Sequence, residues 1–361
     1  MRFVLRRVGF LALTFWAALT LNFLLPRIMP GNPVEAAIAQ LRVPLTPNEI
    51  NAIAAQFGIK QNQGLLSEYF TYLGHIFTGN LGISFAHFPT PVTTYIESGI
   101  WWTLGLVGTT TVLAFFAGTA VGAIAAWRRG SRLDSTIPPL LVFTTAIPIF
   151  WVGLMLILVF SSVLGWLPSK GAYSLGATPA FTPAFILDVL QHAILPACAL
   201  LITTTGAWVL TMRNTMVGTL TEDYVRMARA KGLPSHRIMV NYGARNAILP
   251  NLTGFAMSLG FVVSGAILVE YVFNYPGVGF MLLQAVQSND YPLMQGLFLL
   301  ITVAVLLCIV LSDIATAILD PRTRTASEPW QCLSPSPARR PPACPTRPHC
   351  RPRRGPGAAS R

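Results

Sequence analysis

The stretch "EDYVRMARAKGLPSHRIMVNYGARNAILP", residues 222–250, is the most polar long segment in the first 320 residues. It carries five Arg and Lys residues and lies between two long apolar segments. The whole chain of 361 residues is 53% hydrophobic and only 11% charged, whereas soluble domains carry about 25% charged residues. This composition, with several apolar runs of about 20 residues, predicts an integral membrane protein. We therefore expect residues 222–250 to lie at a membrane surface.

The predicted fold class is all-α, a polytopic membrane protein with six transmembrane helices. The expected spans are 9–29, 102–126, 137–164, 190–212, 251–273 and 293–319. Three arginines precede the first apolar run, as in a secretory signal. The nearest Ala-x-Ala lies well beyond that run, at 37–39. We therefore interpret 1–30 as an uncleaved N-terminal transmembrane helix and 101–320 as a five-helix core containing a cytoplasmic loop, 213–250.

The Arg and Lys residues fall mainly on one side of the predicted spans. If six spans alternate, twelve basic residues before the tail lie on one side and four on the other. The richer side is cytoplasmic by the positive-inside rule. Both termini and residues 222–250 are then predicted to be cytoplasmic. The twelve are Arg2, Arg6, Arg7, Arg128, Arg129, Arg132, Arg213, Arg226, Arg229, Lys231, Arg237 and Arg245.

The segment 31–100 is predicted to be an extracytoplasmic loop with short amphipathic helices. Thr46, Pro47 and Glu49 form a capping-box pattern before a helix that Gly58 would end. A second apolar stripe at helical spacing runs over 65–77. These helices either pack on the spans or help a partner to dock, and the pattern does not separate the two.

Several classes of function are disfavoured by the residues. The net charge of +12 is explained by loops beside membrane spans, so we expect no nucleic-acid partner. There is no Cys-x-x-Cys pair, no clustered histidine set and no nucleophile motif, so no metal or cofactor is expected on this chain. The acidic groups in the spans, Asp188, Glu270 and Asp313, lie near span ends, where we expect them to reach water or a neighbour.

Residues 222–250 are predicted to form two short helices with a sharp bend. Glu222 and Asp223 suit the positive end of a helix dipole. Gly232 can adopt the left-handed conformation that ends the first helix, and Pro234 begins the next one. Such an amphipathic knob fits a groove on another protein. The alternative is a helix pair lying on anionic lipid.

The segments "DYVRMARAKGL" (223–233) and "RNAILP" (245–250) resemble the signature loop of ABC importer permeases, in the longer form of the dipeptide/oligopeptide subfamily. Met227 stands where that form has Thr, and Ile248-Leu249 reverses the usual order. Further resemblances occur in the same order along the first 325 residues. They are "MPGNPV" (29–34), "GNLGISF" (79–85), "WRRGSRLD" (127–134), "IPIFWVGL" (147–154), "LGWLPSKG" (164–171), "VEYVFNYPGVG" (269–279), "DYPLMQGL" (290–297) and "LDPRTR" (319–324). A departure is "GIKQNQ" at 58–63.

The resemblance implies a type I ABC importer permease fold and a set of partners. These are a second, homologous permease, two ATP-binding cassette subunits that carry ATP and Mg²⁺, an extracytoplasmic substrate-binding protein, and membrane lipid. The signature loop would dock into a groove on one ATPase. Gly232 would set the bend, Ala228 and Ala230 would allow close approach, and Tyr224, Arg226 and Lys231 would contact the ATPase. The predicted coupling-loop residues are Asp223, Tyr224, Arg226, Ala228, Ala230, Lys231, Gly232 and Pro250.

Residues 327–361 differ in texture from the rest of the chain. They are mostly Pro, Arg, Ser, Ala and Cys, with no helical or strand period. We predict a disordered basic tail, and we hypothesise a non-native reading frame, because the subfamily usually ends near "DPRTR".

Two other functions would require features of the sequence that differ from these. A self-contained secondary transporter or channel predicts mid-membrane ionisable groups or inverted repeats, and a membrane-embedded enzyme predicts a nucleophile–base or metal set within the spans. The sequence favours neither, and it does not specify the substrate.

Overall fold

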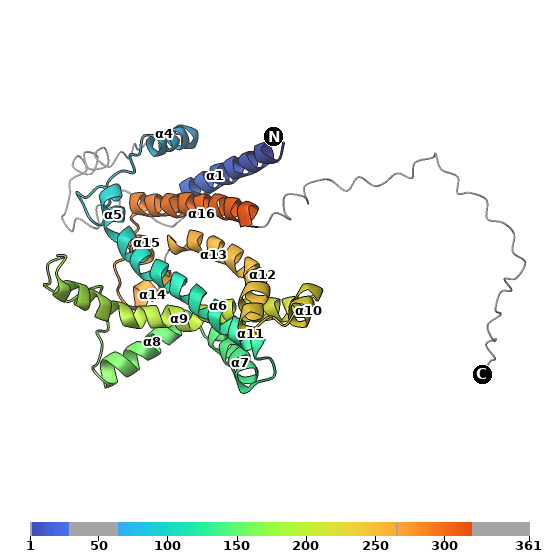
Figure 1. Cartoon of the computed structure of the whole chain (residues 1–361). Coiled ribbons are helices and arrows are strands. Elements are labelled where there is room, and N and C mark those ends of the chain that lie inside the picture. The colour runs from blue at the N-terminus through green and yellow to red at the C-terminus, as the bar shows by residue number, and fades with distance from the viewer. Residues whose placement is uncertain (1, 29–63, 265, 320–361) are drawn as a thin grey trace, which may run out of the picture. The chain divides into compact units, whose positions relative to one another are not determined.

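The structure, a computed structural model, describes residues 2–28, 64–264 and 266–319, and all of them belong to one unit, Met1–Asp320. In these ranges the regular elements are helices (Figure 1). Their bounds are α1 Arg2–Ile28, α4 Leu65–Phe77, α5 Val92–Thr103, η1 Leu104–Gly108, α6 Thr109–Trp127, α7 Arg132–Ala146, α8 Ile149–Leu156, η2 Ile157–Val163, α9 Pro183–Thr219, α10 Asp223–Ala230, α11 Ser235–Arg237, η3 Ile238–Ala244, α12 Arg245–Ala247, α13 Leu249–Val262, α14 Ile267–Val272, α15 Val278–Gln287 and α16 Tyr291–Leu319. The η elements are π-helical turns. The all-α fold class is confirmed.

Four of the described helices are long and apolar enough to cross a membrane, or five if one bent pair counts as a single span. They are Arg7–Leu25, Val92–Trp127, Pro183–Thr219 and Tyr291–Ile314, and they correspond to the first, second, fourth and sixth predicted spans. The second and fourth have 36 and 37 residues, more than the 20 or so that a bilayer requires. These two helices therefore continue beyond the predicted membrane boundaries.

The third predicted span, 137–164, is a bent pair of helices that pass together as one candidate span. Its two halves meet at an angle of 94°. The break lies at Ile147, whose φ of −79° and ψ of 130° are extended, and at Pro148 after it. A residue before proline is pushed out of the helical region, and proline cannot donate the backbone hydrogen bond that would continue the helix.

The fifth predicted span, 251–273, is divided into α13 and α14. At 14 residues, α13 would extend about 21 Å at 1.5 Å per residue, short of a hydrocarbon core of about 30 Å. It ends where the Ser264 N–H and hydroxyl both bond to the Phe261 carbonyl, at 3.1 and 2.6 Å. The total of six spans and the placement of the termini stay predictions.

The helix predicted over 65–77 is α4, which packs on α1. The Tyr69 hydroxyl lies 2.9 Å from the Thr20 hydroxyl, and Arg27 binds Glu68 at 2.8 Å. Its position outside the membrane stays a prediction. The capping box at 46–49 and the tail at 327–361 lie outside the described residues.

The acidic groups of the spans find neighbours, as predicted. Glu270 is completely buried and accepts hydrogen bonds from the Thr103 hydroxyl at 2.9 Å and from the N–H groups of Gly279 and Phe280 at 2.8 and 3.1 Å. It thereby caps the N-terminus of α15. Asp188 accepts from Ser174, and Asp313 pairs with Arg7.

The helices α6 and α9 pack closely against each other in the core. A methyl group built on Gly118 would meet the Trp208 Cβ at 2.5 Å, and one on Gly122 would meet the Val209 carbonyl oxygen at 2.5 Å. Two glycines four residues apart allow such backbone approach between helices in lipid. The α6–α9 pair is therefore a tightly packed body, against which α7, α8 and α13 also pack.

Candidate functional site

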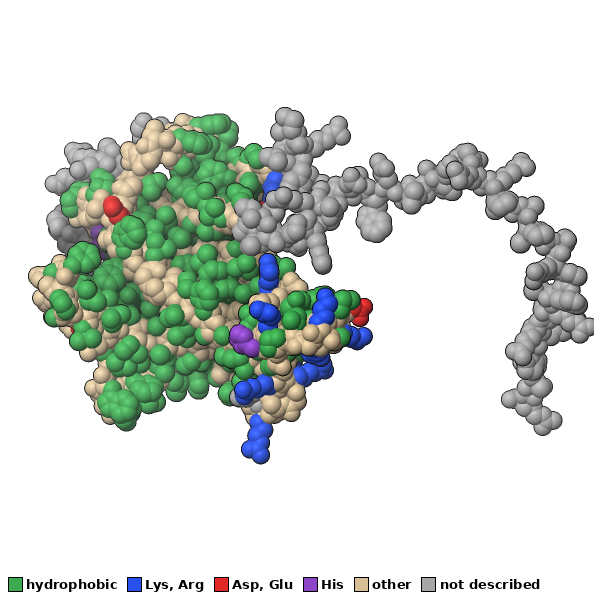
Figure 2. All heavy atoms as spheres, viewed as in Figure 1, with side chains coloured by type: hydrophobic (Ala, Val, Ile, Leu, Met, Phe, Trp, Pro, Cys, Tyr) green, Lys and Arg blue, Asp and Glu red, His purple; other side chains and the backbone are tan. Residues whose placement is uncertain are grey.

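The polar stretch 222–250 forms a knob at one end of the unit, where α10, α11 and α12 gather (Figure 1). Lys and Arg side chains cluster over the same end in Figure 2, while the rest of the visible face is largely hydrophobic.

Outside the knob, an ion pair between Arg7 and Asp313 joins the start of α1 to the end of α16. Among the described residues, no three His, Cys, Asp or Glu side chains gather in a way that could hold a metal.

A small apolar cluster holds the first arm of the knob in place. Val225 and Ala228, on the inner side of α10, are buried with Ile238 of the second arm. The cluster is completed by the partly buried side chains of Trp127, Leu220, Leu233 and Tyr242. The knob therefore has its own core, and Trp127 and Leu220 connect that core to the ends of α6 and α9.

The bend between the arms is a Schellman motif centred on Gly232. The Leu233 N–H bonds to the Ala228 carbonyl at 3.4 Å, and the Gly232 N–H bonds to the Arg229 carbonyl at 2.9 Å. Gly232 has a φ of +73°, which only glycine adopts without a steric penalty. The predicted left-handed glycine is confirmed, and Leu233 makes the hydrophobic contact that accompanies this motif.

The second arm, 235–247, runs through α11, η3 and α12 and carries a π-helical stretch in its middle. It packs closely on the end of α9 at Gly243, where an added methyl group would meet Leu220 and Met216 at 3.1 Å each. π-helical turns inside α-helices occur frequently at functional sites. Leu249 and Pro250 then begin α13.

Most of the predicted coupling-loop residues lie on the outer surface of the knob. Asp223 and Arg226 form an ion pair at 3.5 Å with side chains 94% and 71% exposed, so solvent screens it. Ala228 differs from the rest, because it is 3% exposed and supports the bend from inside. The exposed members are Asp223, Tyr224, Arg226, Ala230, Lys231, Gly232 and Pro250.

One contact between the two arms was not predicted. The Asn246 side-chain amide donates to the Tyr224 hydroxyl at 3.0 Å. This bond links α10 to α12 across the exposed side of the knob. The two residues are 22 positions apart, so no local sequence pattern could indicate the pairing.

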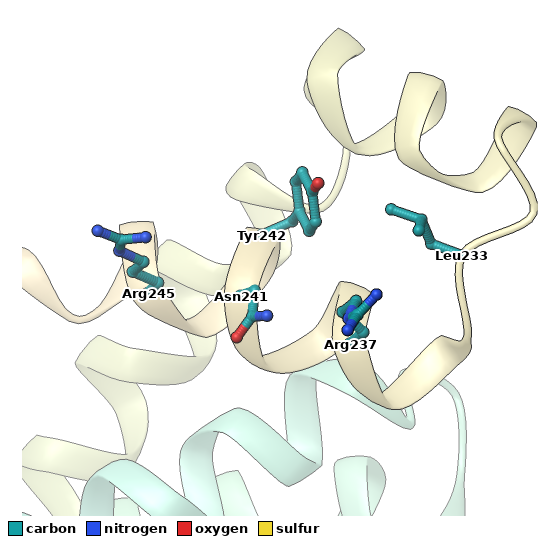
Figure 3. A pocket seen from close by; sticks show the side chains of 5 residues that line it. All are labelled: Leu233, Arg237, Asn241, Tyr242 and Arg245. Atoms are coloured by element: carbon teal, nitrogen blue, oxygen red, sulfur yellow. The ribbon is translucent and has the colours of Figure 1, made fainter.

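An open groove runs along the second arm below the bend (Figure 3). Its volume is ≈ 560 Å³ and it is lined by Leu233, Arg237, Asn241, Tyr242 and Arg245. Arg237, Asn241 and Arg245 follow at intervals of four along the same helix, a spacing that the sequence shows and that indicates one polar face. No ion pair within the described residues involves either arginine. The groove is therefore a positively charged surface suited to anionic groups.

A family profile and individual relatives both relate this chain to membrane components of transport systems. The profile of the family described as "binding-protein-dependent transport system inner membrane component" matches residues 118–325. A di/tripeptide transport system permease protein of Pseudomonas aeruginosa is 35% identical, over 89% of this chain and 98% of its own. A dipeptide transport system permease protein of Escherichia coli K12 is 32% identical, over 90% and 99%. An oligopeptide transport system permease protein of Bacillus subtilis is 31% identical, over 84% and 92%.

Proposed function

Because the chain belongs to the family of inner membrane components of binding-protein-dependent transport systems, we propose that ATP-driven partners in the cytosol bind residues 222–250 and transmit their movement to the chain at this site. The chain is a transport subunit of the bacterial inner membrane and not an enzyme. The proposed substrates are peptides or related small solutes, because the relatives are named as transporters of dipeptides, tripeptides and oligopeptides.

The observation that carries this proposal is the construction of the knob. It presents an exposed polar surface, yet its two arms are held together by the Val225–Ala228–Ile238 cluster and by a glycine bend. A segment built in this way transmits a displacement instead of absorbing it. The charged groove and the exposed face of α10 are the two surfaces that a docked protein would contact.

The proposed assembly contains two permeases, two ATPase subunits that hold ATP and Mg²⁺, and an extracytoplasmic substrate-binding protein. The distribution of basic residues, twelve on the knob side against four on the other, supports a cytosolic position for the knob and both termini. ATP-driven closure of the ATPases would draw the two knobs together. The helices attached to them would then change from inward-open to outward-open.

Reconstitution tests this function directly. Proteoliposomes would contain this chain, its partner permease and both ATPases, with the binding protein and a labelled dipeptide outside. We expect uptake that requires ATP and that is lost when the ATPases are omitted. Uptake of equal rate without the ATPases would contradict the proposal and favour a self-contained transporter.

The alternative role of the knob is adsorption to anionic lipid, which its positive groove also allows. Co-purification of the ATPases with the chain in nanodiscs of neutral and of anionic lipid separates the two roles. The coupling role predicts that knob charge-reversal variants lose ATPase binding in both lipids.

A further inference from the structure

Asn251 is the first buried side chain after the knob, directly following Pro250 at the start of α13. It is 1% exposed. Its side-chain amide donates to the Thr119 hydroxyl of α6 at 3.1 Å and to the Trp208 carbonyl of α9 at 3.1 Å. One side chain thus joins three helices at the base of the knob.

The same three helices meet again one turn away, through aromatic rings. Phe115 of α6 stacks on Phe255 of α13 with ring centroids 4.3 Å apart, and it meets Trp208 of α9 edge-on at 5.6 Å. Phe255 lies four residues after Asn251, and Phe115 lies four residues before Thr119. The junction therefore has a polar layer next to the knob and an aromatic layer behind it.

The position of this junction sets it apart from other helix contacts. Both ends of the knob pass through it, because α9 leads into the knob and α13 leads out of it. The backbones of α6 and α9 already approach each other closely at Gly118 and Gly122. In contrast, α13 is attached to this pair through the side-chain contacts of the junction. This attachment lets a displacement of the knob move α13 together with α6 and α9.

We propose that Asn251 is a positioning residue for transport, which locks α13 to the α6–α9 pair so that the three helices follow the knob as one body. The inference rests on the proposed function. It predicts that loss of the lock leaves the ATPases bound and active but no longer coupled to uptake.

The test uses the whole reconstituted transporter and three variants. Asn251→Leu removes both hydrogen bonds and keeps the branching and the number of side-chain heavy atoms, and Thr119→Val removes one of the two bonds. Asn22→Leu is the matched control, because Asn22 is also buried, at 4% exposure, and its amide donates to the Tyr72 hydroxyl and the Gln295 carbonyl at 3.0 and 2.9 Å, away from the knob. For each variant the measured quantity is the number of dipeptides taken up per ATP hydrolysed.

We expect that ratio to fall about tenfold for Asn251→Leu and about threefold for Thr119→Val, in line with the loss of two and of one buried hydrogen bond. Co-purification of the ATPases should be unchanged, and Asn22→Leu should keep the wild-type ratio. A wild-type ratio in both junction variants would overturn the proposal, and so would an equal fall in Asn22→Leu. If the Asn251→Leu protein does not accumulate in the membrane, the ratio measured for Thr119→Val decides whether the proposal holds. If the wild-type chain itself takes up dipeptide without ATPases, the proposed function fails, whatever the variants do.

Discussion

Replacing Gly232 should lower the rate of transport, and more so the more conformational free energy the new residue needs to adopt the left-handed backbone conformation. An alanine there would have open space around its methyl group, since nothing lies within 4 Å. The substitution therefore acts only through the φ of +73°, which costs about 1–2 kcal/mol for a residue with a Cβ. That cost lowers the population of the bent knob relative to other conformations about five- to thirtyfold.

The series Gly232→Asn, Gly232→Ala and Gly232→Val grades this cost. Asparagine tolerates the left-handed region better than alanine, and a β-branched residue tolerates it least. We expect uptake to fall in that order and to be abolished by valine, with membrane insertion intact. The matched control is Gly130→Ala, because Gly130 has a φ of +82° with nothing within 4 Å but lies in another loop.

The assay is ATP-dependent uptake of labelled dipeptide into proteoliposomes, normalised to inserted protein. Wild-type uptake by the valine variant would refute the reasoning, as would lower uptake by asparagine than by alanine. Loss of inserted protein in the valine variant would show that Gly232 serves folding and not coupling. A fall in uptake for Gly130→Ala as large as for Gly232→Ala would remove the link to the knob.

Two further predictions follow from the charged groove and from the core. The double variant Arg237→Glu/Arg245→Glu should bind the ATPases about tenfold more weakly at low salt, and its binding should depend less on salt than that of the wild type, because the groove then repels acidic groups. Co-purification of the ATPases at several ionic strengths measures this binding. An equal effect of Arg128→Glu would contradict the prediction. Gly122→Ala should lower the free energy of unfolding by about 1–3 kcal/mol, because the added methyl group overpacks α6 against α9; the measurement is the melting temperature in detergent. The control Gly9→Ala should be neutral, because nothing lies within 4 Å of an added methyl group there. Equal melting temperatures for the two variants would show that the α6–α9 contact can relax.

The elements predictable from sequence are those set by local chemistry. Continuous apolar runs identified α1, α9 and α16. Gly232 fixed the bend, because only glycine takes its backbone conformation readily. The stripe over 65–77 identified α4, because apolar residues at helical spacing need no tertiary information.

What the sequence did not reveal depends on competition between local signals and on distant contacts. Pro148 breaks the third span because the missing backbone hydrogen bond outweighs the apolar run around it. The Tyr224–Asn246 bond and the attachment of Asn251 join residues far apart in the chain. Ala228 was predicted to allow close approach, and its burial beside Val225 and Ile238 follows from the fold of the knob.

Cross-linking from the knob tests the central claim most directly. In a cysteine-free background, Met227→Cys places a thiol on the exposed side of α10, where Met227 is 60% exposed. Trp16→Cys places one on α1, where Trp16 is 55% exposed. In membranes that contain the complete transporter, we predict that a short bifunctional reagent joins residue 227, and not residue 16, to an ATPase subunit. The absence of an ATPase adduct from residue 227, while ATP-driven uptake continues, would contradict the account.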